Sequence, residues 1–270
     1  MSVPLASTFE PDASSNLAIE VDDVSASYYL RVGRAAGWWG LRGLFGSDGA
    51  GRREVQALRD VSFSVPKGTV LGIIGRNGAG KSTLLRTISG ILAPSKGRIT
   101  VRGRISPLLS VGLGMQADLT GRENIRLGAL AHGHHSRDLA QLEESIAEFA
   151  QLGEYLDYPF RSYSAGMRAR LGFAVAAHLD PEVLLIDEAL AGGDAKYKEK
   201  VEERMFDLCG DGRTIVIVTH TLATVRAIAT TGLWLHQGKV VEFGDPDEVV
   251  DEYMRYCRIS ELDLSTVDDA

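Results

Sequence analysis

The stretch Gly75-Arg76-Asn77-Gly78-Ala79-Gly80-Lys81-Ser82-Thr83 decides the fold, because it matches the phosphate-binding pattern G-x-x-x-x-G-K-[ST] at every required position. The short apolar run at 70–74 has the composition of a buried strand, and residues 84–88 continue at helical spacing. Strand, loop and helix therefore follow in the order that a nucleoside triphosphate site requires.

Length and composition indicate one substantial globular core. The chain has 270 residues, of which 44% are hydrophobic and 24% charged. A net charge of −7 argues against a nucleic-acid partner held by bulk electrostatics. Two cysteines, Cys209 and Cys257, do not make a disulfide framework or zinc site. No apolar run reaches the roughly 20 residues that span a bilayer, and no signal peptide is evident, so we expect a cytosolic chain unless a partner holds it at a membrane.

The N-terminal third combines strand patterns with an unusual insertion. Residues 1–16 have the composition of a flexible tail. Residues 17–21 and 24–29 have the pattern of extended structure, and Tyr28 either stacks on a base or packs at a strand edge. The segment 31–53 interleaves seven glycines with five arginines and two tryptophans. It is either a basic amphipathic element for a headgroup surface or membrane partner, or a solvated insertion folded back on the domain.

The next segments predict a β-rich part followed by helices. Residues 55–65 predict a strand that feeds a hairpin through the turn 66–68, and two short strands around Gly103 add an antiparallel component. Thr120 and Glu123 form a capping box before a helix through 131, and a second helix is expected at 140–152. The histidines at 132–135 favour a solvated turn over a metal site.

Two later strands end in polar residues suited to phosphate chemistry. Residues 182–188 form an apolar run that ends in two acids, and a carboxylate beside a phosphate loop suits a hydrated Mg²⁺. Asp187 is that candidate, and Glu188 is placed to polarise the attacking water. The strand at 213–220 ends in His220, level with the γ-phosphate. Singly, each residue could cap a strand, but their joint order after a phosphate loop favours a catalytic site.

The sequence also resembles the nucleotide-binding subunits of ABC transporters over about 17–256. The run Tyr163-Ser164-Ala165-Gly166-Met167 stands where that family carries its Leu-Ser-Gly-Gly-Gln signature. Tyr-Ser-x-Gly-Met is the form of the branch that exports cell-surface polysaccharides such as O-antigen, teichoic acid and mycobacterial galactan. The phosphate loop, residues 119–124 and residues 238–241 look like the same branch.

This resemblance implies ATP and Mg²⁺ as cofactors and gives roles to individual residues. The implied phosphate-binding set is Gly75, Asn77, Gly78, Ala79, Gly80, Lys81, Ser82 and Thr83. Ser82 and Asp187 would bind Mg²⁺, Glu188 would be the catalytic base, and His220 the switch histidine. Tyr28 would stack on adenine, and Asp194 would lie in the loop that crosses a dimer interface. Ser164 and Gly166 would act on a neighbour's ATP, which predicts a homodimer.

Two departures from the family pattern matter. The loop glutamine of the family should fall near Ser110 or Val111, and Gln116 lies too far along the chain to take its place. The chain ends in an acidic tail, 257–270, where many O-antigen exporters append a carbohydrate-binding domain, so we expect sugar selectivity to reside in a membrane partner. The insertion 31–53 lies where this branch carries a helix close to the membrane gate, which favours contact with that partner.

The expected fold is an α/β P-loop ATPase core with a mixed sheet, an antiparallel β subdomain and a helical signature subdomain at about 112–178, within one nucleotide-binding domain at 17–256. The expected function is ATP hydrolysis, as a homodimer under an integral membrane permease at the cytoplasmic face of the membrane, that drives export of a lipid-linked polysaccharide. The alternatives are an exporter of a lipid or drug, a soluble ABC ATPase that acts on ribosomes or DNA, or a P-loop kinase or GTPase, which would lack the signature segment.

Overall fold

The structure is a computed structural model and describes residues 16–31, 52–108, 114–135, 137–187 and 195–265. Several expectations lie outside these ranges, namely those for the tail 1–15, most of the 31–53 insertion, Ser110, Val111, Glu188, Asp194 and the end of the acidic tail.

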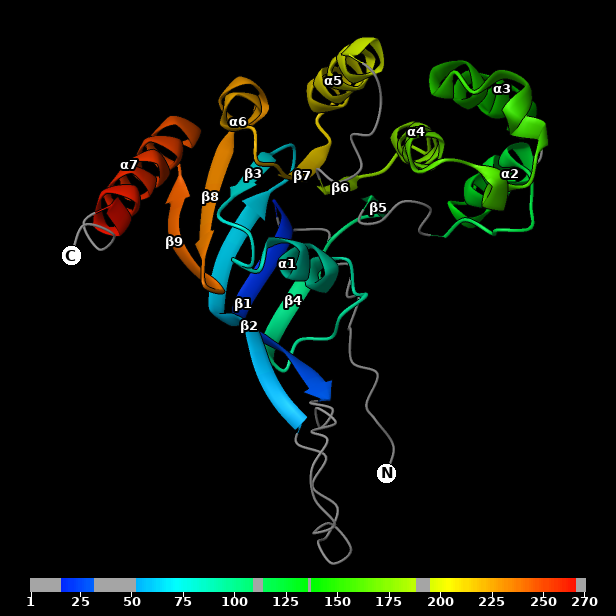
Figure 1. Cartoon of the computed structure of the whole chain (residues 1–270). Coiled ribbons are helices and arrows are strands. Elements are labelled where there is room, and N and C mark those ends of the chain that lie inside the picture. Colours follow the sequence, from blue (N-terminus) through cyan, green and yellow to red (C-terminus); the bar gives the residue numbers. More distant parts are fainter. Residues whose placement is uncertain (1–15, 32–51, 109–113, 136, 188–194, 266–270) are drawn as a thin grey trace, which may run out of the picture.

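A six-stranded sheet forms the centre of the molecule (Figure 1), with the strand order β5-β6-β7-β3-β8-β9. Every neighbouring pair is parallel except β8 and β9, which are antiparallel. Its strands are β3 (Val70–Ile74), β5 (Ile105–Leu108), β6 (Val183–Asp187), β7 (Thr214–Val218), β8 (Thr231–His236) and β9 (Lys239–Gly244). The central strands β3 and β7 are buried along their whole length, as expected for parallel strands covered on both faces. The mixed sheet predicted from the sequence is confirmed.

A separate antiparallel sheet has the order β2-β1-β4. Its strands are β1 (Leu17–Arg31), β2 (Arg52–Pro66) and β4 (Lys96–Val101). The two predicted extended pieces at 17–21 and 24–29 are one strand, in which the pairing shifts register between Val21 and Val24. Strands β1 and β2 stay paired as far as Arg31 opposite Arg52, so they form the ribbon from which the insertion leaves.

The predicted hairpin across the turn 66–68 is wrong. Strand β2 pairs with β1, whereas β3 pairs with β7 and β8 in the other sheet. The same division separates the two strands around Gly103, because β4 joins β1 while β5 lies parallel to β6. The difference in burial explains this division. Strand β3 is buried on both faces, as in the interior of a covered parallel sheet, whereas β2 buries mainly alternate residues, as in an antiparallel sheet with one open face.

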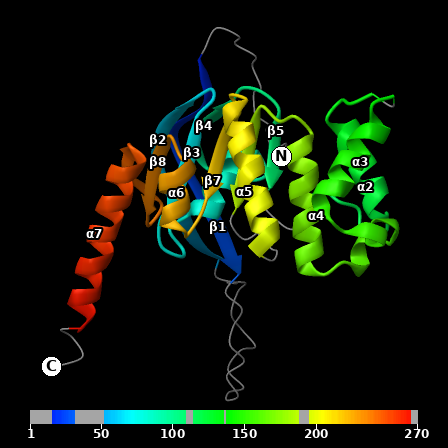
Figure 2. The ribbon, with the colours of Figure 1, turned by 90° about the horizontal axis from the view of Figure 1, so that it is seen from above.

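Helices cover the central sheet and bind the two sheets together. They are α1 (Lys81–Ile88), α5 (Ala195–Gly210), α6 (Leu222–Ile228) and α7 (Pro246–Ser265). Leu84, Leu85 and Ile88 of α1 pack in one buried cluster with residues of both sheets. Helix α7 lies at one end of the molecule, against β8. Three helices that are not in this set lie together at the opposite end (Figures 1 and 2).

The helices at that opposite end are α2 (Gly121–Ala131), α3 (Leu139–Ala150) and α4 (Ala165–His178), with short 3₁₀ turns η1 (Gly153–Asp157) and η2 (Phe160–Ser162). The predicted capping box is confirmed, because the Thr120 side chain accepts from the Glu123 amide and the Glu123 side chain accepts from the Thr120 amide. Glu143 of α3 is buried and pairs with Arg122 and Arg126 of α2. Among the described helices, none is long and apolar enough to cross a bilayer.

Candidate functional site

The phosphate loop connects β3 to α1 at the carboxyl edge of the central sheet. Gly75, Gly78 and Gly80 all have positive φ, at 149°, 81° and 107°. A β-carbon on Gly75 would lie 2.2 Å from the Leu235 carbonyl oxygen, and one on Gly80 would lie 2.6 Å from the Ala57 carbonyl oxygen. The loop therefore needs glycine for both its conformation and its close packing. Gly80 gives α1 no side-chain cap, so the first helical turn directs amide groups to the hollow of the loop.

Lys81 is the cation of this loop. Its side chain is buried, and Nζ donates to the carbonyl oxygens of Gly75 at 2.6 Å and Arg76 at 3.1 Å. These bonds hold the ammonium group against the backbone of the loop, where it can pair with the oxygens of a bound phosphate. A positive charge and a ring of backbone amides suit a polyphosphate and little else.

The turn between β8 and β9 supports the loop from outside. The Gly238 amide donates to the Ala79 carbonyl oxygen at 2.9 Å, and the Gly238 carbonyl accepts from the Arg59 amide at 2.8 Å. Gly238 also has a positive φ of 79°. This contact was not foreseen from the sequence, although the glycine that follows Gln237 at the hairpin was a signal for such a tight turn.

Asp187 and His220 lie where the sequence places them, at the carboxyl ends of neighbouring strands. Asp187 ends β6, and His220 follows β7 by two residues. Since β7 separates β6 from β3, the aspartate, the histidine and the phosphate loop occupy three adjacent strand ends. Thr219, which directly precedes His220, is buried, and its hydroxyl oxygen accepts from the Thr221 amide at 3.0 Å. Glu188 and Asp194 lie outside the described residues.

Tyr28 also reaches the loop helix. Its hydroxyl donates to the Thr83 hydroxyl oxygen at 3.3 Å, which joins β1 to the first turn of α1. The side chain is half-buried, whereas the neighbouring Tyr29 is 67% exposed. Of the two readings of Tyr28, the contact with α1 favours a place at the site over packing at a remote strand edge.

Ser164 and Gly166 belong to the helices at the far end of the sheet and not to the loop. Ser164 is the N-cap of α4, and its hydroxyl accepts from the Met167 amide at 3.2 Å. The serine is exposed, although Tyr163 before it is buried. An exposed helix N-terminus with a hydroxyl can receive an anion from another molecule.

The segment that would hold the family's loop glutamine lies outside the described residues, at 109–113. The residues after it are pinned by Asn124, which is buried. Its side-chain oxygen accepts from the Gln116 amide at 2.7 Å, and its side-chain nitrogen donates to the Gln116 carbonyl at 3.0 Å. Both the backbone amide and the backbone carbonyl of Gln116 thus bind the Asn124 side chain.

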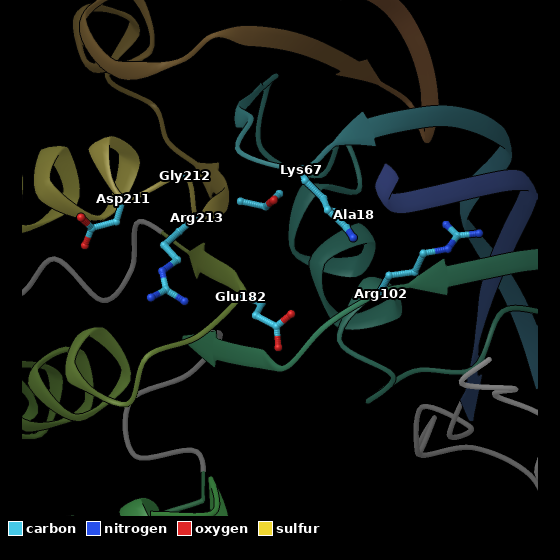
Figure 3. Close-up of a pocket in the computed structure, with 8 residues that line it drawn as sticks. Ala18, Lys67, Arg102, Glu182, Asp211, Gly212 and Arg213 are labelled. Carbon is cyan, nitrogen blue, oxygen red and sulfur yellow. The ribbon is translucent and has the colours of Figure 1, made fainter. Parts of the chain in front are cut away.

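Among the described residues, two hollows that lie away from the phosphate loop differ in character. The first is a mixed-charge cavity at the amino ends of β6 and β7, lined among others by Lys67, Arg102, Arg213 and Glu182 (Figure 3). The Glu182 carboxylate projects among the cations, which disfavours a triphosphate there. The second is an apolar groove of about 260 Å³ between β5, α2 and α4.

Fold and site together define a P-loop ATPase. Residues 58–191 match the family model described as ABC transporter. The teichoic acids export ATP-binding protein TagH of Listeria innocua is 38% identical over 243 residues, which are 90% of this chain and 71% of that protein. The O-antigen export system ATP-binding protein RfbB of Klebsiella pneumoniae is 41% identical over 201 residues, or 74% of this chain and 82% of that protein.

The chain belongs to the ABC transporter family. Its fold is also that of the ATP-binding cassette MJ0796, solved as a dimer in a post-hydrolysis state bound to ADP and Pi, with a TM-score of 0.69 and 20% identity over 84% of this chain and 98% of that one. The chain is therefore an ATP-binding, ATP-hydrolysing cassette, as expected from its signature segment.

Proposed function

We propose that this chain is the ATP-hydrolysing subunit of an exporter that moves a lipid-linked cell-surface or cell-wall polysaccharide across the cytoplasmic membrane. The observation that carries the proposal is the likeness to teichoic acid and O-antigen export ATP-binding proteins at 38% and 41% identity over most of the chain. The Tyr163-Ser164-Ala165-Gly166-Met167 form of the signature supports the same branch. Export of a lipid or drug is the alternative substrate class.

In this proposal the loop holds the nucleotide from one side. Lys81 and the backbone of 77–82 bind the β- and γ-phosphates, and Tyr28 stacks on adenine. The Ser82 hydroxyl and the Asp187 carboxylate are the protein ligands of Mg²⁺. This small set of protein ligands suits Mg²⁺, which usually keeps several waters and binds through phosphate oxygens. The described residues hold no group of three or more His, Cys, Asp or Glu side chains that could bind a metal ion by themselves.

The residues that we propose to act on the bound nucleotide come shortly after β6 and β7 in the sequence. Glu188 is the general base for the attacking water, and His220 contacts the γ-phosphate from the end of β7. The Mg²⁺ ion supplies neutralisation of phosphate charge. Asp194 belongs to the segment that crosses to the second subunit.

Two chains complete the site. Ser164 and Gly166 of one chain close over the phosphates on the loop of the other, because α1 and α4 lie apart within a single chain (Figure 1). The homodimer places two nucleotides between two chains, and the dimeric state of the related cassette supports this arrangement.

The membrane partner would occupy the apolar groove, which is lined by Leu108, Met115, Leu127, Val175 and Leu179 among others. Leu130 lies on the same helix as Leu127 and is 50% exposed. A short amphipathic segment of an integral permease fits such a surface. The chain would then be peripheral, at the cytoplasmic face of the membrane.

The experiment is purification from native membranes of a tagged Glu188→Gln chain with ATP, alongside Lys81→Ala. Glu188→Gln should bind ATP, stop turnover and trap the dimer on its permease, whereas Lys81→Ala should not trap it. In cells, Lys81→Ala should leave lipid-linked polymer inside and deplete it from the surface. Undiminished surface polymer would exclude polysaccharide export, and a co-purifying permease with lipid or drug cargo would select the alternative.

A further inference from the structure

Tyr163 occupies the position directly before the signature serine, where the family pattern has leucine. The tyrosine is 3% exposed, and its ring packs against Phe160 with ring centroids 5.4 Å apart. Its hydroxyl donates to the carbonyl oxygen of Tyr155 in η1 at 2.6 Å. Burial raises the pKa of the Tyr163 phenol, so the hydroxyl stays protonated and remains a donor.

The same hydroxyl meets the start of α2. The Gly121 backbone lies close to the phenol oxygen and opposes the rise of the Tyr163 pKa. A β-carbon on Gly121 would lie 2.3 Å from that oxygen. Gly121 is not among the described glycines with positive φ, so glycine is required here for space and not for conformation. One oxygen thus joins η1, the first residue of α2 and the residue before Ser164.

Ser164 itself has few restraints beyond this one. It is exposed, and its hydroxyl caps its own helix through the Met167 amide. Arg168 of the same helix adds a bond from Nε to the Tyr163 carbonyl oxygen at 3.0 Å. The anchor of Tyr163 therefore acts together with the start of α4, where the Arg168 amide bonds to the Ser164 carbonyl oxygen at 3.0 Å, to set the position of the serine. A hydrophobic residue at 163 would fill the same space without the hydrogen bond to Tyr155.

We propose that Tyr163 is a positioning residue for ATP hydrolysis: its hydroxyl, bonded to the Tyr155 carbonyl oxygen and packed against Gly121, fixes Ser164 in the orientation that closes the neighbour's nucleotide site. This inference rests on the proposed role of Ser164. A displacement of a catalytic group by about 1 Å can cost roughly 100-fold in rate, so a loosened serine should slow turnover without weakening binding to the loop.

The test compares Tyr163→Phe with Ser164→Ala in the full chain. Tyr163→Phe keeps the ring and removes only the hydroxyl. We expect kcat to fall about tenfold, on the order expected for a partial loss of orientation, while ATP affinity of the isolated chain, measured with a fluorescent ATP analogue, changes less than about twofold. Tyr158→Phe is the matched control, because its side chain is exposed on the neighbouring turn and should leave kcat unchanged.

Two double variants separate positioning from general weakening. Added to Ser164→Ala, Tyr163→Phe should cause no further loss of kcat, because the hydroxyl acts through the serine. Gly121→Ala should lower kcat in the natural chain and lower it less in the Tyr163→Phe chain, where the oxygen that its β-carbon strikes is gone.

The outcomes distinguish the inference from the function on which it rests. If Ser164→Ala leaves turnover intact, the proposed shared site is wrong. If Ser164→Ala abolishes turnover but Tyr163→Phe has natural kcat, the serine acts without this anchor and the inference is overturned. A fall in ATP affinity equal to the fall in kcat, or fully additive losses in the double variants, would assign Tyr163 to folding alone.

Discussion

The phosphate loop and the start of the signature helix are both proposed to bind phosphate, yet they are built in opposite ways. The loop is packed against other strands on several sides, and Lys81 is only 7% exposed. Ser164, in contrast, is exposed and bonds to its own helix. The loop is complete as the structure has it, whereas the serine has an open side. This difference is what we expect if, as proposed, the loop binds phosphate within one chain and Ser164 acts on phosphate held by a second chain.

The largest effect on the packing of the loop is expected from Gly80→Ala, with Gly78→Ala as the matched control. Both glycines have positive φ, but a β-carbon on Gly80 meets the Ala57 carbonyl oxygen at 2.6 Å and one on Gly78 meets nothing within 4 Å. Gly78→Ala should cost about 1–2 kcal/mol of unfolding free energy from its backbone conformation alone. Gly80→Ala should cost about 2–4 kcal/mol more from the added clash. Urea unfolding without nucleotide measures both, and equal losses would contradict the close packing.

The next effect concerns the base-binding side of the loop. Tyr28→Ala should weaken ATP affinity by about 5- to 150-fold, because stacking of a base on an aromatic ring contributes roughly 1–3 kcal/mol. Tyr28→Phe should retain most of the affinity, since it keeps the ring and loses only the bond to Thr83. Tyr29→Ala, at the exposed neighbour, is the control. Isothermal titration with ATP measures all three, and an unchanged Tyr28→Ala would place adenine elsewhere.

The smallest expected effect lies in the signature helix. His178, in the last turn of α4, has Nδ1 2.7 Å from the Ala174 carbonyl oxygen and its ring 5.0 Å from that of Phe149. Burial lowers its pKa below the ordinary value of 6.5. The unfolded chain therefore takes up a proton that the folded chain resists, and the free energy of unfolding should fall as the pH drops below about 6.5.

Urea unfolding of the natural chain and of His178→Gln, each at several pH values between 5 and 8, measures this contribution. The natural chain should lose more stability than the variant on the acid side. Parallel curves would show that the buried histidine does not drive the loss.

The parts that the sequence predicts well are those in which local pattern and local structure coincide. The phosphate loop, the capping box of α2 and the helix bounds near 121–131 all follow from residues a few positions apart. The division of strands between two sheets does not, because the partners of β3 lie about 145 and 160 residues further along the chain. The Tyr163 anchor was equally hidden, since it joins a hydroxyl to backbone groups that only the fold brings together.

The contact between the loop and the β8–β9 hairpin has a consequence for synthesis of the chain. Val70 donates its amide to the hydroxyl of Thr230, and the loop itself is closed by Leu235 and Gly238. A nascent chain that contains the loop but not yet these residues has the complete phosphate-binding motif and lacks the contacts that hold the loop in place. We therefore expect the nascent chain to bind nucleotide only after its C-terminal third has been synthesised and has folded against the loop.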